Sequence, residues 1–354
     1  MEYFHDKVNS AKFLEINKIL TEFSNEEMKD VVQFLIDNDK NMIILKNKEV
    51  KNRIKLNNNL YENKNMDFNF VNKISLILKL IYNYNYELLN NNLHITDNDY
   101  NLINMELVDK GIYINKKLLN IDYCDNLLNV FNNKIYIDRN DNMKNHKLNI
   151  YDIDFFKNKS LWIKNQSEII NNIYIKNIIT DNYIYNIVKN YLNAEPILCQ
   201  VNFWINGESN INSTQVFHQD RDHLRFLKIF IYLNDVNENN GAHIYVEKSK
   251  NNIKMENNNY KPGIRVSDNF INLNYKNNIK IIEGKKGSII FEDTTGFHKG
   301  GIVNTNFRYL LQIEYCISTR YVMEGNGSIL NLDKNIYKDV YEKYPNLFLF
   351  CKLV

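Results

Sequence analysis

The chain of 354 residues carries a formal net charge of +2, from 44 lysines and arginines against 42 aspartates and glutamates. This balance excludes a protein steered as a whole toward nucleic acid or an anionic membrane. A hydrophobic content of 44% excludes a disordered chain. No apolar stretch approaches the roughly 20 residues that cross a bilayer, and residues 1–10 lack the apolar core of a secretory signal. We therefore expect a soluble, cytoplasmic protein that binds neither nucleic acid nor membrane.

Helical patterns predominate in the first half of the chain. Ser24-Asn25-Glu26-Glu27 is a capping box followed by apolar residues at helical spacing, and residues 96–99 repeat the box. Gly111 stands where a left-handed helix C-cap belongs. After the first helix, in chain order, we expect helices over 70–89 and 102–107, a short strand over 112–114 and a helix over 122–131.

After Pro196 the apolar pattern changes from helical to alternating or continuous. Turn residues such as Asn206-Gly207 and Asn240-Gly241 separate the segments. Short strands without intervening helices indicate an antiparallel sandwich or barrel, and residues 336–350 indicate a helix packed outside it. The expected strands cover residues 198–205, 214–218, 224–233, 243–246, 279–282, 288–291 and 308–317.

Residues that can do chemistry lie at the ends of these strands. His218 and Asp220 are two positions apart and so project from one face, and His298 follows a neighbouring strand. Two imidazoles and one carboxylate form a facial triad, which leaves three adjacent positions open on an octahedral metal ion. Arg308 begins an otherwise apolar strand, where a buried guanidinium requires an anion and suits a carboxylate.

In these residues and their surroundings the sequence resembles the phytanoyl-CoA dioxygenase family of Fe(II)/2-oxoglutarate oxygenases. The likeness covers roughly residues 98–320. It implies an α+β fold in which a double-stranded β-helix, a jelly-roll or cupin-like barrel, is flanked by helices and preceded by a helical N-terminal region. The likeness is carried by Phe217-His218-Gln219-Asp220, by residues 228–241 and 287–293, and by His298, Asn304 and Arg308.

The expected domain organisation has three parts. Residues 1–95 form a helical N-terminal extension, which is a candidate surface for a homodimer or a protein partner. Residues 96–325 form the oxygenase domain, with its barrel core at about 196–318. Residues 326–354 form a C-terminal helix packed on the barrel.

The resemblance also implies an activity and a set of site residues. His218, Asp220 and His298 are then catalytic and bind Fe(II), Arg308 binds the distal carboxylate of 2-oxoglutarate, and Gln219 and Asn304 are further cosubstrate contacts. The expected enzyme is a dioxygenase that uses Fe(II), 2-oxoglutarate and O2 to hydroxylate a C–H bond of a small organic molecule, with succinate and CO2 as co-products. The candidate substrate contacts are Lys228, Arg225, Arg265 and His243.

Two alternatives from other functional classes stay open. The run 218–223 partly matches the HxHxDH motif of dinuclear zinc hydrolases, whose ligands here would be His218, Asp220, Asp222 and His223. Against this reading, Asp220 replaces the second histidine, and a long strand follows instead of a glycine-rich helix start. The other alternative is a barrel that keeps its fold but only binds a ligand or partner.

Overall fold

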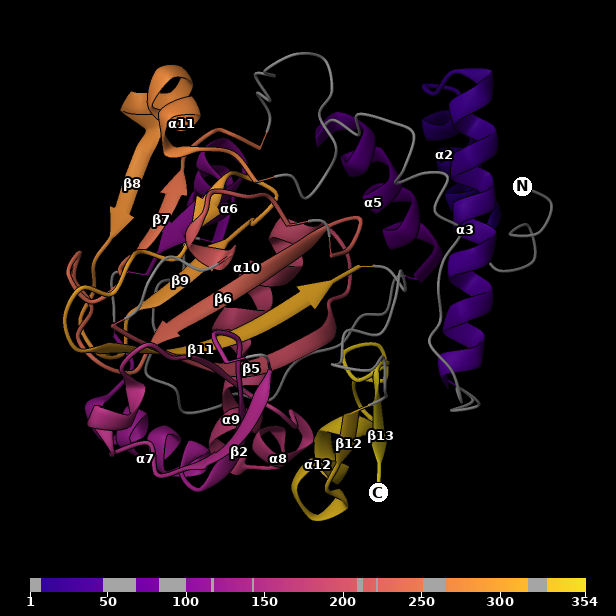
Figure 1. Cartoon of the computed structure of the whole chain (residues 1–354). Helices are drawn as coiled ribbons and strands as arrows, with labels where there is room; N and C mark the ends of the chain where they lie inside the picture. Colours follow the sequence, from indigo (N-terminus) through magenta and orange to yellow (C-terminus); the bar gives the residue numbers. More distant parts are fainter. Residues whose placement is uncertain are drawn as a thin grey trace.

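The computed structural model describes residues 8–46, 68–82, 100–115, 118–141, 143–208, 213–220, 222–250, 265–317 and 330–354. Helices α2 (Ser10–Leu20), α3 (Asn25–Lys46) and α5 (Phe68–Tyr82) stand together at one side of the sheets (Figure 1). The capping box before α3 is confirmed, because the Ser24 amide donates to Glu27 (2.9 Å) and the Glu27 amide donates to Ser24 Oγ (3.2 Å). The second expected box, at 96–99, lies outside the described residues.

Helix α6 (Tyr100–Lys110), strand β1 (Ile112–Ile114) and helix α7 (Ile121–Phe131) follow the expected order. Gly111 joins α6 to β1 with a φ of +87°, and its amide donates to Leu107 O (2.9 Å). A Cβ at this position would lie 2.0 Å from Tyr245 Oη. The glycine is therefore needed twice, for its left-handed backbone and for the close approach of the tyrosine.

One antiparallel sheet of eight strands forms the centre of the molecule. Its order is β1-β9-β6-β11-β5-β4-β2-β3, so β11 lies between β5 and β6. The strands besides β1 are β2 (Lys134–Asp138), β3 (Lys144–Leu148), β4 (Ser160–Ile163), β5 (Ile197–Gly207), β6 (Phe226–Tyr232), β9 (Ile289–Glu292) and β11 (Phe307–Cys316).

A smaller sheet packs against the large one. Its order is β10-β7-β8, from β7 (His243–Val246), β8 (Ile279–Ile282) and β10 (His298–Lys299). An apolar cluster joins the two sheets, with Phe230 and Leu310 from the large sheet and Tyr245 and Ile282 from the small one. Among the described strands no ladder of hydrogen bonds connects the sheets, so the expected barrel is described as two packed layers, without hydrogen-bonded closure.

Several elements differ from the sequence-based expectation. The region between α7 and β5 holds β2, β3 and β4 followed by α8 (Ser167–Ile170), α9 (Ile173–Ile179) and α10 (Asn182–Leu192). Helix α11 (Asp268–Tyr275) separates β7 from β8, so the expectation that no helix interrupts the strands is wrong. Its short, polar sequence has too few apolar residues for a helical period to stand out.

The expected strand over 214–218 and the expected C-terminal helix are both shorter than predicted. Residues 213–215 form a 3₁₀ turn, and only Phe217 and His218 pair as isolated bridges. Helix α12 (Lys334–Tyr341) ends well before residue 350, and β12 (Leu330–Leu332) pairs in parallel with β13 (Cys351–Leu353). Leu347 to Phe350 are buried as a turn, so their apolar character reflects packing instead of a helical face.

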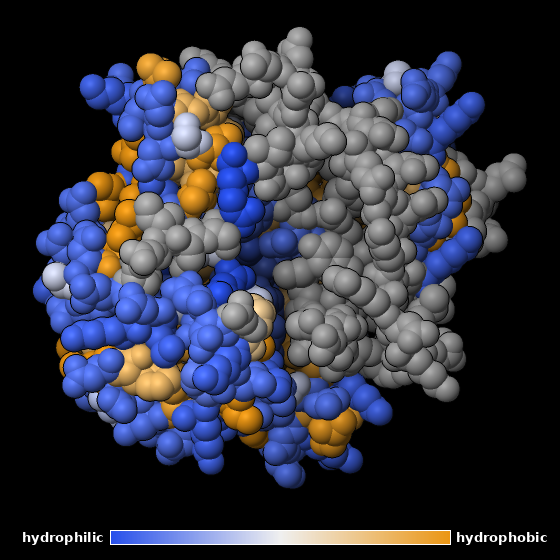
Figure 2. All heavy atoms as spheres, viewed as in Figure 1, coloured by the Kyte–Doolittle hydropathy of each residue, from blue (hydrophilic) through white to orange (hydrophobic). Residues whose placement is uncertain are grey.

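Hydrophilic residues cover most of the described surface on one face, and the most hydrophilic of them border a recess near its centre (Figure 2). Within the described residues, no helix is both long enough and apolar enough to cross a membrane.

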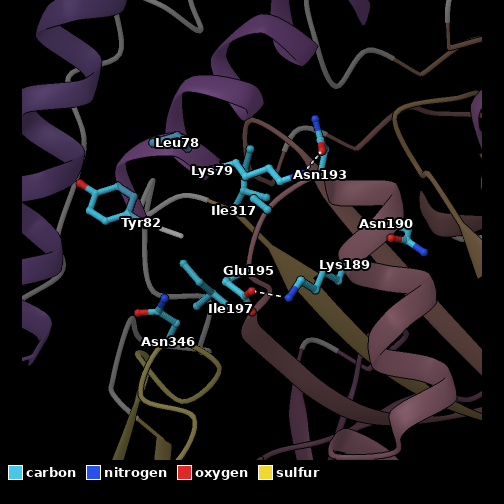
Figure 3. A pocket seen from close by; sticks show the side chains of 11 residues that line it. Leu78, Lys79, Tyr82, Lys189, Asn190, Asn193, Glu195, Ile197, Ile317 and Asn346 are labelled. Atoms are coloured by element: carbon cyan, nitrogen blue, oxygen red, sulfur yellow. Dashed lines mark hydrogen bonds and ion pairs between the residues drawn. The ribbon is translucent and has the colours of Figure 1, made fainter. Parts of the chain in front are cut away.

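The N-terminal helices meet the rest of the chain at a small cavity of about 90 Å³ (Figure 3). Lys79 of α5 donates to Asn193 Oδ1 (3.1 Å) at the end of α10, and Lys189 of α10 pairs with Glu195. These charged and polar groups therefore already have partners, and the cavity offers no cluster of reactive side chains.

Candidate metal centre and its cavity

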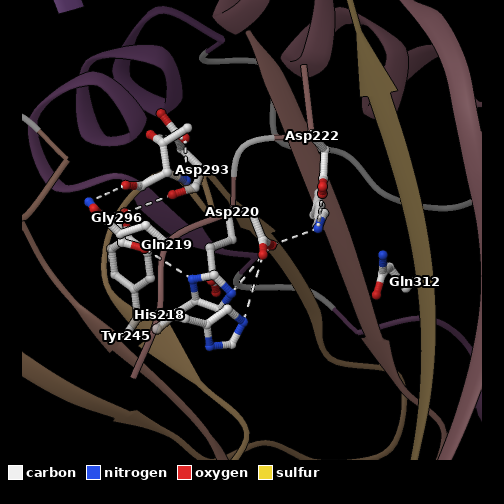
Figure 4. Close-up of polar contacts among 12 residues, drawn as sticks. His218, Gln219, Asp220, Asp222, Tyr245, Asp293, Gly296 and Gln312 are labelled. Carbon is white, nitrogen blue, oxygen red and sulfur yellow. Dashed lines mark hydrogen bonds and ion pairs between the residues drawn. The ribbon is translucent and has the colours of Figure 1, made fainter. Parts of the chain in front are cut away.

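The backbone brings His218 and His298 together. The two residues form an antiparallel bridge in which each amide donates to the other residue's carbonyl at 3.0 Å. The Asp220 amide donates to Thr294 O (2.8 Å), which ties the carboxylate to the segment before β10. His218 Nε2 lies 3.7 Å from Asp220 Oδ1 and His298 Nε2 lies 3.4 Å from Asp220 Oδ2 (Figure 4). The potential ligand atoms of the three residues all lie within 4.8 Å of one another.

Hydrogen bonds fix which ring nitrogen each histidine offers. His218 Nδ1 lies 2.8 Å from Val216 O, and His298 Nδ1 lies 3.0 Å from Gly296 O. A carbonyl only accepts, so each Nδ1 carries a proton, and in the neutral ring Nε2 holds the lone pair that can bind a metal ion. Burial opposes the charged form of His298, but the Asp220 carboxylate outweighs it and raises the pKa of this histidine, so its ring must lose any proton on Nε2 before it can bind a metal ion. Burial, with the neighbouring His298, lowers the pKa of His218 to about 3, so its imidazole is neutral at pH 7. Neutral imidazole is the form that binds a metal ion.

Lys228 holds the third member of the cluster. Its Nζ donates to Asp220 Oδ2 (2.7 Å) and to Asp222 Oδ2 (2.8 Å), and it lies 3.7 Å from Glu314 Oε2. Burial opposes the charged form of Asp220, but Lys228 outweighs it and holds the pKa of the carboxyl well below its usual value. Asp220 is therefore ionised, and Lys228, predicted as a substrate contact, is occupied by carboxylates of the chain.

Arg308 is buried at the start of β11 without an anion. Its Nη1 donates to Gly241 O and its Nη2 donates to Asn206 Oδ1 (2.9 Å), both of which are neutral groups. Its Nε has no hydrogen-bond partner, and it forms no ion pair with a described residue. A Cβ at Gly300 would lie 3.3 Å from Arg308 Nη2, so a glycine there leaves room beside the guanidinium. A buried arginine with a free N–H group fits the carboxylate predicted for it.

The triad and Arg308 line one cavity of about 250 Å³. Most of the side chains that line it are polar or charged, with an apolar part from Trp162, Trp204, Phe230 and Leu310, so the cavity suits a small polar organic ligand. Trp204 donates from Nε1 to Gln312 Oε1 (3.1 Å), and Gln312 donates to Gln200 Oε1 (2.8 Å), so one wall is a connected polar row. The wall also includes Arg139, Trp162, Phe230, His243 and Leu310.

The other predicted contacts lie outside this cavity, apart from His243. Gln219 donates to Thr295 O (2.6 Å) and Asn304 is exposed in a loop, so neither is brought to the cavity. Arg225 donates to Asn72 Oδ1 (2.8 Å) and stacks on Tyr191, and Arg265 is exposed without lining the cavity. These four residues therefore do not meet the metal centre in this conformation.

His243 does line the cavity, but its ring is already engaged. Its Nε2 donates to Glu292 Oε1 (2.9 Å), a fully buried carboxylate on β9 of the large sheet. Its ring centroid lies 5.7 Å from that of His298. This places His243 beside the metal ligands as a packed, hydrogen-bonded group.

The four ligands of the zinc hydrolase alternative do not converge. His223 is buried with Cys199 and Cys316, while His218 and Asp220 group with His298. Lys228 forms ion pairs with both Asp220 and Asp222. A dinuclear site would need these two carboxylates to be available to metal ions, but the lysine already occupies them. The geometry therefore favours a single-metal site over the dinuclear one.

Arg139 and Trp162 are among the cavity-lining residues that sequence reasoning missed. They lie in the turn after β2 and in β4, in the region between α7 and β5 that the periodicity did not reveal. Trp162 is one of only two tryptophans in the chain, and its scarcity was the one available hint.

Comparisons with known proteins give distant likenesses. No family model matches the chain and no curated protein matches it. Among solved structures, the epimerase SnoN in complex with Fe3+, alpha-ketoglutarate and nogalamycin RO is 10% identical, covering 64% of this chain and 87% of that chain, with a TM-score of 0.46. EctD from S. alaskensis in its apoform is 14% identical, covering 66% and 83%, with a TM-score of 0.44. EvdO2 from Micromonospora carbonacea var. aurantiaca, complexed with 2-oxoglutarate, is 12% identical, covering 64% and 93%, with a TM-score of 0.43. Because these sequence identities and TM-scores are low, we infer the function from the geometry of the site.

Proposed function

We propose that this protein is an Fe(II)- and 2-oxoglutarate-dependent dioxygenase that hydroxylates a C–H bond of a small organic molecule, with succinate and CO2 as co-products. The observation that carries the proposal is the presence, in one cavity, of a two-histidine, one-carboxylate cluster and a buried arginine that has no anion among the described residues. A 2-oxo acid with a second carboxylate matches both features, because one end chelates a metal ion and the other needs a cation.

The order of the strands supports a double-stranded β-helix. Along the chain β6 lies in the large sheet, β7 and β8 in the small sheet, β9 in the large sheet, β10 in the small sheet and β11 in the large sheet. The Phe217–His218 bridges add a further rung beside β10. This alternation between two packed antiparallel sheets is the arrangement expected of a jelly roll.

Each site residue has a defined task in the proposed reaction. His218 Nε2, His298 Nε2 and one oxygen of Asp220 would hold Fe(II) and leave three adjacent positions open. Arg308 would bind the distal carboxylate of 2-oxoglutarate through its free Nε–H. When bound, Fe(II) and 2-oxoglutarate supply the activation of O2. Lys228 keeps Asp220 ionised and in place, while Phe230 and Leu310 exclude water from the cavity.

Anaerobic ligand binding tests the proposal without knowledge of the substrate. Adding Fe(II) and then 2-oxoglutarate is expected to give a visible charge-transfer band and saturable cosubstrate binding by calorimetry. His218→Ala should abolish the band, and Arg308→Met should weaken 2-oxoglutarate binding by about 100-fold while metal binding persists. Arg265→Met is the matched control, since it removes the same charge from an exposed position.

Succinate release from a metabolite extract then separates an enzyme from a binding module. Release that depends on His218 and Asp220, with a product that gains one oxygen atom, is the expected result. Two bound zinc ions per chain without 2-oxoglutarate binding would replace the proposal with the hydrolase alternative. Cosubstrate binding without any turnover would leave only a ligand-binding protein.

A further inference from the structure

Arg139 packs against both tryptophans of the protein at the wall of the cavity. Its guanidinium carbon lies 4.3 Å from the ring centroid of Trp162 and 4.8 Å from that of Trp204. The two rings stand opposite each other on β4 and β5, with centroids 5.2 Å apart. Stacking occupies the flat face of a guanidinium and leaves its N–H edge for hydrogen bonds in the plane.

The backbone that carries Arg139 is held firmly. The Arg139 amide donates to Ser160 O (2.9 Å). The preceding carboxylate, Asp138, is fully buried and accepts from the amides of Asn140 (2.9 Å) and Ser160 (3.3 Å) and from Lys159 Nζ (3.0 Å). These hydrogen bonds fix the turn after β2 to β4. Together with the two tryptophan rings, they hold the Arg139 guanidinium in place, and such preorganisation favours ligand binding.

Arg139 has no anion of its own in the described part of the chain. Its guanidinium makes no hydrogen bond and no ion pair there, although two carboxylates are close in sequence: Asp138 pairs with Lys159 and Asp141 pairs with Lys144. Burial, together with the charge of Arg265, lowers the pKa of Arg139 to about 10 against the opposing charge of Asp220, which lies near it without forming an ion pair, and Arg139 is still charged at pH 7. A fixed, partly desolvated cation in a cavity favours an anionic ligand.

Besides Lys228, which is paired with carboxylates of the chain, the cavity holds two arginines on different elements. Arg308 belongs to β11 and is held by Asn206 and Gly241, whereas Arg139 belongs to the turn after β2 and is held by the tryptophans. Their separate anchoring gives each its own ligand position along the same wall. One dicarboxylic cosubstrate accounts for Arg308 and the metal triad, which leaves Arg139 for a second molecule.

We propose that Arg139, Trp162 and Trp204 form a second anion-binding subsite, and that the substrate is a small organic anion whose carboxylate, sulfate or phosphate group Arg139 binds. The identification of this anion as the substrate rests on the proposed function; the existence of the subsite does not. The tryptophan faces supply apolar contact for the organic part of the molecule.

Intrinsic tryptophan fluorescence provides a direct readout, because the chain has only two tryptophans and both belong to the subsite. The probes are benzoate and phenyl phosphate, with benzamide as the neutral match, titrated into the metal-free full-length protein. We expect a saturable change in emission with the two anions and none with benzamide. The same titration with Arg308→Met separates this subsite from the proposed cosubstrate position, and the response should persist.

Variants of Arg139 test whether this residue binds the anion. Arg139→Met should weaken binding of the anions at least about tenfold, and Arg139→Lys, which keeps the charge without the planar fork, should lie between it and the wild type. Arg265→Met is the control for the general field at the cavity mouth and should retain wild-type affinity. Circular dichroism and thermal melting verify that each variant is folded.

The results separate the two proposals. Equal affinity in the wild type and Arg139→Met, equal losses in Arg139→Met and Arg265→Met, or no saturable response to either anion would each overturn the subsite. If anion binding follows Arg139 but no charge-transfer band forms with Fe(II) and 2-oxoglutarate, the subsite stands and the dioxygenase function falls. If the band forms and anion binding is absent, the function stands and the subsite falls.

Discussion

At the scale of single residues, Lys228 organises the acidic side of the cavity. One buried ammonium group serves Asp220, Asp222 and Glu314, and two of these contacts are direct hydrogen bonds. A divalent metal ion at the triad would add a second positive charge beside the same carboxylates. Asp220 and Asp222 alone exceed what one lysine neutralises, and a metal ion bound at the triad would complete the charge balance.

Lys228→Met should expose this balance. Removing one partner of a buried ionic cluster costs about 3 kcal/mol, because the carboxylates stay buried without a cation. Without metal, the melting temperature of the variant should lie well below that of the wild type. Adding Ni(II) should raise the melting temperature of the variant more than that of the wild type. Thermal melting with and without metal measures this difference. Lys280→Met, at a half-exposed pair with Glu247, should change neither value.

The pH dependence of stability should reveal Glu314. Burial raises the pKa of this carboxyl from 4.5 to about 8. Between these values the folded chain keeps a proton that the unfolded chain releases, so the free energy of unfolding falls as pH rises and levels off above about 8. Glu314→Gln removes this loss and should be more stable than the wild type by at most about 5 kcal/mol near pH 9, with little difference near pH 4.5. Urea unfolding of both proteins near pH 4.5 and near pH 9 tests this prediction. If their free energies of unfolding differ by the same amount at both pH values, the raised pKa of Glu314 is refuted.

Sequence alone predicted the convergence of the metal triad but not Arg139. His218 and Asp220 are two positions apart in the sequence, and His298 follows a strand with a clear apolar run, so local spacing carried the information even though residues 218–220 form no continuous strand. The contact of Arg139 with Trp162 and Trp204 joins a turn to two strands, and only the folded sheet brings them together. The roles of these residues toward metal and ligand stay predictions.

At the scale of elements, strands β2 to β4 extend the large sheet and carry one wall of the cavity. They escaped prediction because edge strands such as Lys144–Leu148 are mostly polar and show little alternation. By contrast, β7 and β8 were predicted with their exact bounds, since short apolar runs between turn residues define them. Burial alone does not decide what periodicity finds, because β4 was missed although it is mostly buried and β8 was found although only Ile282 of it is buried.

Asp138→Asn tests how much the β2 turn depends on its buried carboxylate. The change weakens three hydrogen bonds, including one to a lysine, and should cost about 2 kcal/mol of stability. It should also weaken benzoate binding, because Arg139 is the next residue. Asp141→Asn is the matched control in the same turn, where the pairing with Lys144 is exposed, and it should leave melting temperature and binding unchanged.

At the scale of the whole molecule, Gly111 joins the helical part of the chain to both sheets. It ends α6, begins β1 of the large sheet and lies against Tyr245 of the small sheet. The division of the chain into an N-terminal extension, an oxygenase domain and a C-terminal part stays a prediction, as do a cytoplasmic location and a partner for the N-terminal helices. The close contact at Gly111 lies within the expected oxygenase domain, since both Gly111 and Tyr245 fall in residues 96–325.

Gly111→Ala should destabilise the protein by about 3 kcal/mol, through the left-handed backbone and the clash with Tyr245 Oη. In a Tyr245→Phe background the hydroxyl is gone, but the ring carbon Cζ would still lie 2.9 Å from the new Cβ, so the cost of the same substitution should drop to about 2 kcal/mol, of which about 1 kcal/mol is the backbone part. Chemical denaturation of the four proteins in this double-mutant cycle gives the coupling. Equal costs in both backgrounds would mean that the tyrosine does not limit this position.

The backbone bridge between His218 and His298 has a consequence for metal content. The chain, and not the ion, sets the spacing of the two imidazoles, because each residue's amide and carbonyl are bonded to the other's. A rigid pair of nitrogen donors with one carboxylate accepts several divalent ions, and affinity for such a site follows the Irving–Williams order. The ion found in a purified sample would then report the supply of metals in the producing cell, so chelation and reloading must come before any assay.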